Sequence, residues 1–171
     1  GANATGKVED VLTFFKVAVI GVFGLCGVYY ATTSGQLTLG VSKIASVGPI
    51  MGAAMSFVAF QGWQLLMYDQ EQFENPEADI SRAILASIPA ATFLYAIVAV
   101  TTVSLLELSL IAVAPEVSLL YAALPYMGRI GALIIGLSAL FSTASAVNAT
   151  LFSGAQFSRS LIDDGLLPEK L

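Results

Sequence analysis

The chain has 171 residues, of which 57% are hydrophobic and only 11% charged, and its net charge is −5. Soluble domains carry about a quarter charged residues, so this composition excludes an ordinary soluble domain and indicates that lipid is the solvent. The chain contains no histidine, which excludes histidine metal sites, serine–histidine nucleophile pairs and imidazole proton shuttles. We predict no cofactor and no metal site. The acidic balance and the lack of a basic cluster argue against a nucleic-acid partner.

The first hydrophobic segment covers residues 11–31, close to the length of about 20 residues that a membrane-spanning helix needs. The acidic residues before it do not fit a signal peptide. Because the preceding stretch GANATGKVED lacks an initiator methionine, we expect the chain to come from the middle of a longer polypeptide. Cys26 lies inside this segment and, as the single cysteine, has no disulfide partner in the chain.

Lys16 lies within this first segment, in VLTFFKVAVIG. An ionisable side chain at such depth is costly and usually functional, so Lys16 is a candidate proton carrier. The alternative is that its long stem snorkels to the membrane interface. Ile20, Phe23 and Gly27 fall on nearly the same helical face, and at Gly27 a neighbouring helix could approach closely.

The second hydrophobic segment covers residues 44–68 and is interrupted at Phe60-Gln61-Gly62. Lipid offers the backbone no hydrogen-bond partners, so a break at membrane depth is tolerated only where protein encloses it. Such a break usually marks a solute or ion site, because the carbonyls at the end of the first half-helix attract a cation. The alternative is that Gly62 is a packing glycine and that Gln61 bonds to a neighbouring helix.

An acidic, turn-rich connection at residues 69–82, DQEQFENPEADISR, leads into a third hydrophobic segment at residues 83–106. We expect the N-terminus and the loop at 69–82 to be cytoplasmic, because basic residues then favour the inner side four to two. The inner basic residues would be Lys7, Arg82, Arg159 and Lys170, and the outer ones Lys43 and Arg129.

The connection at residues 106–129 is half apolar, and the stretch after Pro115, EVSLLYAALP, predicts a short amphipathic helix on the membrane surface. The fourth hydrophobic segment covers residues 130–161. Asp163-Asp164-Gly165 follows it, a pattern typical of a helix C-terminus.

Small polar residues are dense in this fourth segment, in SALFSTASAVNATLFSG. In membranes such residues mark close helix packing, and this reading applies to most of them. Hydroxyl and amide oxygens can also ligate a small cation or accept hydrogen bonds from a protonated lysine. The residues concerned are Ser138, Ser142, Thr143, Ser145, Asn148 and Thr150.

Three motifs in order, FVAFQGW, ENPEADISRAI and SRSLIDDGLLP, resemble the amino acid–polyamine–organocation (APC) superfamily of permeases. The residues at pattern positions are Ala59, Phe60, Gly62, Trp63, Asn75, Pro76, Ile80, Ala83, Ile84, Asp164, Gly165 and Pro168. The resemblance implies an all-α integral membrane protein, with residues 1–171 as a single transmembrane fragment of a LeuT-like inverted-repeat fold of five plus five helices. The fragment would hold the fifth to eighth helices, four transmembrane helices of which the second is broken.

The resemblance also implies site residues. In the family, backbone around the break holds the ammonium group of the substrate, which here corresponds to Phe57, Val58, Ala59, Phe60, Gln61 and Gly62. In one proton-coupled branch, a lysine of the fifth helix takes the place of a sodium ion against the eighth helix, which here corresponds to Lys16 with Ser142, Thr143 and Ser145. The chain departs from the family pattern at Gln64, Gln72 and Ser81, so no gating role is carried over from the acids usual there.

The prediction is a secondary active transporter of amino acids or related amines in the cell membrane, coupled to protons. The alternatives are a sodium-coupled carrier or exchanger of the same fold, and an amino acid sensor that binds but does not transport. A membrane enzyme with Lys16 as the base is disfavoured, because no oxyanion motif or metal set occurs. The predicted partners are an amino acid or amine, a proton or Na⁺, the lipid bilayer and the remainder of the same polypeptide.

Overall fold

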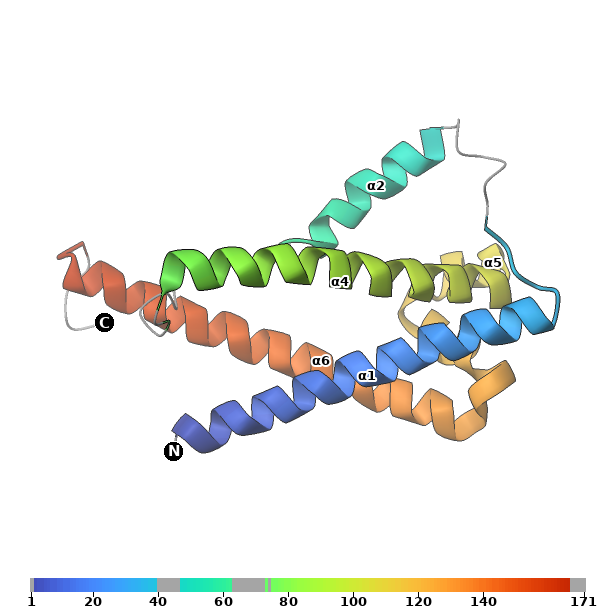
Figure 1. Cartoon of the computed structure of the whole chain (residues 1–171), viewed down its shortest axis with the longest axis horizontal. Coiled ribbons are helices and arrows are strands. Elements are labelled where there is room, and N and C mark those ends of the chain that lie inside the picture. The colour runs from blue at the N-terminus through green and yellow to red at the C-terminus, as the bar shows by residue number, and fades with distance from the viewer. Residues whose placement is uncertain (1, 40–46, 63–72, 74, 167–171) are drawn as a thin grey trace. The chain divides into compact units, whose positions relative to one another are not determined.

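The computed structural model describes residues 2–39, 47–62, 73 and 75–166, with side chains from residue 11 onward. Its described part is helical and contains no strand, which confirms the predicted all-α fold class. Figure 1 shows the helices α1 (Ala2–Thr33), α2 (Val47–Ala59), α4 (Pro76–Leu105), α5 (Leu108–Val113) and α6 (Ser118–Asp163), with a short 3-10 turn, η3, at Pro115–Val117.

Three helical stretches are long and apolar enough to cross a membrane, at Val11–Thr33, Pro76–Leu105 and Pro115–Asp163. They contain the first and fourth hydrophobic segments of the sequence, and the third as far as residue 105. The apolar helix α2 is only 13 residues long. At 1.5 Å per residue it extends for about 20 Å, too short to cross a hydrocarbon core of about 30 Å as a continuous helix. The rest of the second predicted segment, residues 44–46 and 63–68, lies outside the described residues.

The chain divides into two compact units, and each is described by itself. The first unit combines Gly1–Val41 with Ala90–Ala144, and the second combines Ser42–Pro89 with Ser145–Leu171. In the first unit α1 lies beside the later part of α4 and the earlier part of α6 (Figure 1). Its core surrounds the fully buried Phe23 and includes Val19, Ala122, Ala123 and Ile135.

Two glycines of α1 let the neighbouring helix come close. A Cβ atom on Gly24 would lie 2.6 Å from Cγ1 of Ile97 on α4, and a Cβ atom on Gly27 would collide with Thr101 of the same helix. Real Cβ atoms do not approach other heavy atoms so closely, so only glycine fits at these two positions without a shift of the neighbour. The close helix approach that the sequence predicts at Gly27 is confirmed.

Both long terminal helices end in the same glycine motif. At the end of α6, the Leu166 N–H donates to the Leu161 carbonyl at 2.9 Å and the Gly165 N–H to the Ile162 carbonyl at 2.9 Å. Gly165 has φ 71°, a left-handed value that glycine adopts without a steric penalty. The predicted helix C-terminus at Asp163-Asp164-Gly165 is therefore confirmed, and Gly35 (φ 70°) ends α1 in the same way.

The N-terminus of α4 lies in the second unit and is fixed by Asn75 and Asp79. The Asn75 N–H donates to the Asp79 carboxylate at 3.3 Å, while the Asp79 N–H donates to the Asn75 carbonyl at 2.9 Å. Pro76 takes the first helical position, where its missing N–H has no cost. The helix thus begins at Pro76, upstream of the hydrophobic segment that starts at residue 83, because the cap extends it beyond the apolar stretch.

A sharp kink interrupts α6 at Gly128, which has φ 63° and ψ −166°. This region of backbone space is essentially restricted to glycine. The kink separates a short helix that follows Pro115 from the long helix that contains the fourth hydrophobic segment. The short helix buries Ala122 and Ala123 completely in the core of the first unit. The stretch after Pro115 is therefore helical, as predicted, and it packs against protein through these small residues.

Candidate functional site

The helix α2 ends at Ala59, immediately before the interruption that the sequence predicts. The Phe60 N–H donates to the Phe57 carbonyl at 3.1 Å and the Gln61 N–H to the Val58 carbonyl at 3.2 Å. These bonds span three residues instead of four, so the last turn is tightened before the chain leaves the helix. Gly62 then has φ 108°, which only glycine adopts readily.

The end of α2 has the chemistry of a weak cation site. The C-terminal end of a helix carries the negative end of the helix dipole, which favours a positive charge. The carbonyls of Phe57 and Val58 each accept one N–H of the tightened turn, and a carbonyl oxygen has a second lone pair. An ammonium group could therefore bond to these oxygens without breaking the turn.

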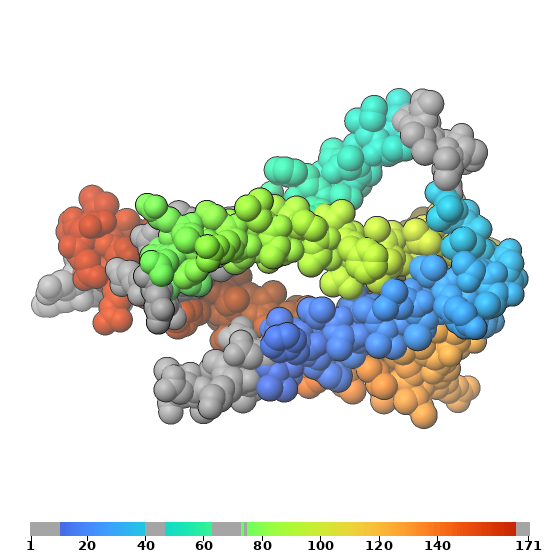
Figure 2. Space-filling model, in the orientation of Figure 1, coloured from blue at the N-terminus to red at the C-terminus, as the bar shows by residue number. Residues whose placement is uncertain are grey.

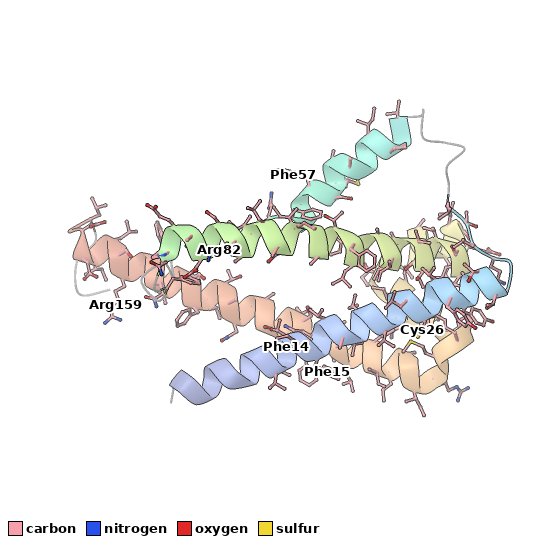
Figure 3. The ribbon with its side chains drawn as sticks, in the orientation of Figure 1. Phe14, Phe15, Cys26, Phe57, Arg82 and Arg159 are labelled. Atoms are coloured by element: carbon pink, nitrogen blue, oxygen red, sulfur yellow. The ribbon has the colours of Figure 1, made fainter. Side chains whose placement is uncertain are left out.

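The side chains around the end of α2 are accessible in this chain. Phe57, at the C-terminal end of α2 (Figure 3), is 71% exposed, and Val58 is 64% exposed. Gln61 is exposed, whereas Phe60 and Gly62 are half-buried. No residue of α2 is buried, and its side chains form part of the surface drawn in Figure 2. The large apolar side chains of this helix, such as Phe57 and Val58, are therefore solvent-accessible within this chain.

Lys16 lies on the N-terminal half of α1 and directly follows Phe15 in the chain. Figure 3 labels Phe14 and Phe15 on this half of the helix. The lysine is half-buried. Among the described residues, no hydrogen bond joins its ammonium group to Ser142 or Thr143 of α6, the two predicted partners that belong to the same unit. Ser145, the third predicted partner, belongs to the second unit.

The polar residues of the fourth hydrophobic segment include an exposed group and a buried group, while Ser145 is half-buried. Ser142, Thr143, Asn148 and Thr150 are exposed. The hydroxyls of Thr143 and Thr150 donate to carbonyls four residues earlier in their own helix, at 3.0 and 2.9 Å. The hydroxyl hydrogens of these two threonines are thus used inside α6, and their oxygens can still accept hydrogen bonds.

The second group is buried. Ser138 is 3% exposed within the first unit, and Ser153 is 4% exposed within the second. Small polar residues allow helices to pack closely in membranes, and these two serines fit that role. Ser138 is among the residues predicted from the sequence and Ser153 is not, although Ser153 stands in the same serine-rich stretch.

Two hydroxyl side chains that sequence reasoning missed bind α1 from two different helices. Thr101 of α4 is fully buried, and its Oγ1 donates to the Gly24 carbonyl at 3.0 Å. The phenol of Tyr126, on the short helix before the kink in α6, donates to the Phe23 carbonyl at 2.8 Å. We call this arrangement of two donors on successive carbonyls the hydroxyl clasp. The glycines of α1 signal a close neighbour, but they do not reveal which hydroxyl occupies the space.

Aromatic rings surround the clasp. The ring of Tyr126 stacks on that of Tyr30 with centroids 5.8 Å apart and planes at 26°, and it lies 6.1 Å from the ring of Phe23. Offset stacked and tilted pairs at such distances are favourable beyond the area they bury. The phenol of Tyr126 is therefore held by its ring as well as by its hydrogen bond.

A hollow of about 530 Å³ lies where α4 passes into α5, within the first unit. Its lining residues are Leu105, Leu106, Glu107, Ser109, Leu110 and Val113. The Glu107 carboxylate accepts a hydrogen bond from the Ser109 hydroxyl at 3.3 Å, so the one charged group of this lining is partly satisfied. No sequence pattern predicted this hollow, because it depends on how the chain turns between α4 and α5.

Three helices of membrane-spanning length in the described part of the chain indicate a multi-pass membrane protein. The whole chain, residues 1–171, matches the family model described as amino acid permease. The chain therefore belongs to the amino acid permease family, which confirms the APC resemblance. This family consists of transporters and not of enzymes.

Two similar proteins that are named as transporters agree with this assignment, and an uncharacterized protein is also similar. An uncharacterized protein of Methanocaldococcus jannaschii is 34% identical over 99% of this chain and 39% of its own length. The inner membrane transport protein YbaT of Escherichia coli is 30% identical over 88% of this chain and 35% of its own length. A methylthioribose transporter of Bacillus subtilis is 24% identical over 98% of this chain and 36% of its own length.

The chain thus spans less than two fifths of the length of these relatives, at most 39%. No solved structure gives a significant match.

Proposed function

We propose that the polypeptide to which this chain belongs is a secondary active transporter of amino acids or related amines, and that this chain supplies the ammonium side of the substrate site. The observation that carries the proposal is the end of an apolar helix at Ala59, followed by Gly62 at φ 108°, in a member of the amino acid permease family. Irregular backbone at membrane depth is tolerated where it lines a cavity, and half-helix ends are the usual solute sites of such carriers.

In this proposal the ammonium group of the substrate bonds to backbone carbonyls at the end of α2, where the helix dipole favours a positive charge. The substrate carboxylate meets a part of the polypeptide outside this chain. The exposed side chains of Phe57 and Val58 are then covered by substrate and by those other parts. The proposed substrate-contacting residues are Phe57, Val58, Ala59, Phe60, Gln61 and Gly62.

Lys16 is the proposed coupling residue. In its protonated form it occupies a cation site whose walls are the hydroxyl oxygens of Ser142, Thr143 and Ser145. Support comes from its half-buried place in an apolar span, and from the Thr143 hydroxyl, whose hydrogen is bound to Ala139 so that its oxygen is left as an acceptor. Loss of the proton toward the cytoplasm removes the charge and loosens the contact between α1 and α6. We propose that the N-terminal side of α1 and the loop at 69–82 face the cytoplasm, as the basic residues favour.

Sodium coupling is the second candidate mechanism, and a protonated Lys16 would oppose it by charge repulsion. The second candidate substrate is methylthioribose, because one relative is named as its transporter. A sensor of the same fold is the third candidate, since it would bind an amino acid and move none.

The test uses the full-length permease in liposomes, with uptake of labelled amino acids measured under an imposed pH gradient or an imposed Na⁺ gradient. We expect uptake driven by the pH gradient alone, lost in Lys16→Ala. Lys16→Arg keeps the charge but does not release its proton, so it should bind substrate and fail to couple. Proton-driven uptake that persists unchanged in Lys16→Ala would rule out the coupling role. Uptake that follows Na⁺ would favour the second mechanism, and binding without uptake would favour a sensor.

A further inference from the structure

We propose that the hydroxyl clasp is the pivot of α1, and that Thr101 and Tyr126 are positioning residues that limit how far the Lys16 half of this helix swings. The pivot itself is inferred from the packing of the first unit. Its effect on transport rests on the proposed function.

Two hydrogen bonds hold α1 at the level of the clasp. Two hydroxyls from two helices converge on the carbonyls of Phe23 and Gly24, which are neighbours in the chain, at 2.8 and 3.0 Å. Thr101 is fully buried, so no water replaces its bond to Gly24. Two donors on successive carbonyls face different directions around a helix, and together they fix both the register and the rotation of α1 at this level.

Thr101 and Tyr126 also contact the backbone of α1 at Gly27. A Cβ atom on Gly27 would lie 2.8 Å from the Thr101 hydroxyl and 2.9 Å from the Tyr126 hydroxyl, so both donors lie against the backbone of α1. The rings of Tyr30 and Phe23 hold the Tyr126 ring on the same side. At this level α1 can neither slide along its neighbours nor move away from them without losing the bonds and the ring contacts together.

The described side chains of α1 are unevenly buried along the helix. Among its described side chains, the buried positions are Val19, Phe23, Gly24, Gly27 and Ala31, all in the C-terminal half. Residues 11–18, which include Lys16, are exposed or half-buried, with Phe14 78% exposed (Figure 3). Among the residues of α1 whose side chains are described, the first unit therefore anchors the helix at and beyond Val19, and residues 11–18 have no comparable anchorage within this chain.

A helix that is held at one level and free on one side moves by tilting about that level. Lys16 precedes Phe23 by seven positions, about 10 Å along the helix axis. A tilt of about 10° displaces the backbone at Lys16 by roughly 2 Å, which is enough to make or break a hydrogen bond. The clasp thereby converts a small change of tilt into a change of the partners that Lys16 reaches.

Adjacent threonines provide a matched pair of variants. Thr101 bonds across to α1, whereas Thr102 donates to the Val98 carbonyl of its own helix at 2.8 Å. Thr101→Val removes the contact between helices, and Thr102→Val removes a hydroxyl of the same kind without touching α1. Thr101→Ser keeps the hydroxyl and serves as the rescue variant.

The structural test measures distances between spin labels in the full-length permease. One label is placed at Phe14, on the free half of α1, and the other at Phe93 on α4, both exposed and both in the first unit. We expect the distance distribution to broaden in Thr101→Val combined with Tyr126→Phe, and to stay as in the wild type in Thr102→Val. A second label pair, Val22 with Phe93, lies close to the clasp on the α1 side and should change little.

The functional test compares the maximal uptake rate with KM. Loss of one hydrogen bond between membrane helices should lower the maximal rate by about threefold, with KM changed less than about twofold. Thr101→Ser should recover the wild-type rate. The pivot is refuted if the label distances in the double variant match those in Thr102→Val, or if both labelled pairs broaden alike. If the wild type transports nothing, the proposed function fails, and the label distances still decide whether the pivot exists.

Discussion

Tyr126 and Phe23 are joined twice, by a 2.8 Å hydrogen bond from the Tyr126 phenol to the Phe23 carbonyl and by rings 6.1 Å apart at 45°. The two contacts can be separated by mutation, because phenylalanine at position 126 keeps the ring and loses the hydroxyl. The contributions of the hydrogen bond and of the ring contact to the stability of the first unit can therefore be measured separately.

Tyr126→Phe should lower the stability of the full-length permease by about 0.6 to 1.7 kcal/mol, the range for hydrogen bonds between membrane helices. Unfolding by a denaturing detergent, followed by circular dichroism, measures the change. Tyr121→Phe is the control, because Tyr121 is on the same short helix and 46% exposed. Equal effects of the two substitutions would contradict a specific role for the bond to Phe23.

Gly27→Ala should destabilise the permease by about 1 to 3 kcal/mol, as expected when an atom is forced into a packed interface. The added methyl group would press on the hydroxyls of Thr101 and Tyr126, at 2.8 and 2.9 Å. Gly21→Ala is the matched control, since nothing lies within 4 Å of a Cβ atom there. Thermal unfolding of the purified variants should place Gly21→Ala at or slightly above the wild type, and similar losses in both would argue against the close approach of α4.

Gly128→Ala should cost about 1 to 3 kcal/mol, because an alanine strains at φ 63° and ψ −166°. The variant should either lose thermal stability or straighten the kink in α6. Gly154→Ala, on the same helix and facing open space, should leave the melting temperature unchanged. A melting temperature of Gly128→Ala equal to that of Gly154→Ala would show that the kink carries no strain.

Gly62→Ala should weaken substrate binding in the full-length permease more than it weakens stability. At φ 108° an alanine forces the backbone after α2 to change, which moves the carbonyls proposed to hold the ammonium group. Equilibrium binding of labelled amino acids measures the effect, and Gly52→Ala within α2, where a Cβ atom meets nothing within 4 Å, is the control. Unchanged affinity in Gly62→Ala would remove this turn from the proposed site.

Local sequence signals predicted the ends of elements and one helix contact. Gly165 marked the end of α6 because a left-handed residue is needed there. Asn75-Pro76 starts α4 by the same kind of local chemistry, but no helix start was predicted at these residues. The start of α4 was placed too late, at residue 83, because hydrophobicity reports the membrane and not the cap. Gly27 predicted a close neighbour because a position without a side chain leaves room for one.

Contacts between distant segments could not be predicted in this way. Thr101 and Thr102 are identical and adjacent, yet one bonds across to α1 and the other to its own helix. The difference arises from the direction in which α1 approaches, which no local pattern encodes. The kink at Gly128 was missed for a related reason, since it lies between two stretches that each read as helical. The grouping of Lys16 with Ser142, Thr143 and Ser145 came from the family resemblance and stays a prediction.

The hydroxyl clasp acts on main-chain oxygens, and this has an evolutionary consequence. Any residue at position 23 offers Tyr126 the same carbonyl acceptor, so the Phe23 side chain can drift as long as the ring contact is replaced. Selection on the hydrogen bonds falls on the two donors alone. Residue covariation between positions 23 and 126, or 24 and 101, would therefore underestimate how firmly these helices are joined, and permease variants should be compared by whether they keep a hydroxyl at 101 and 126.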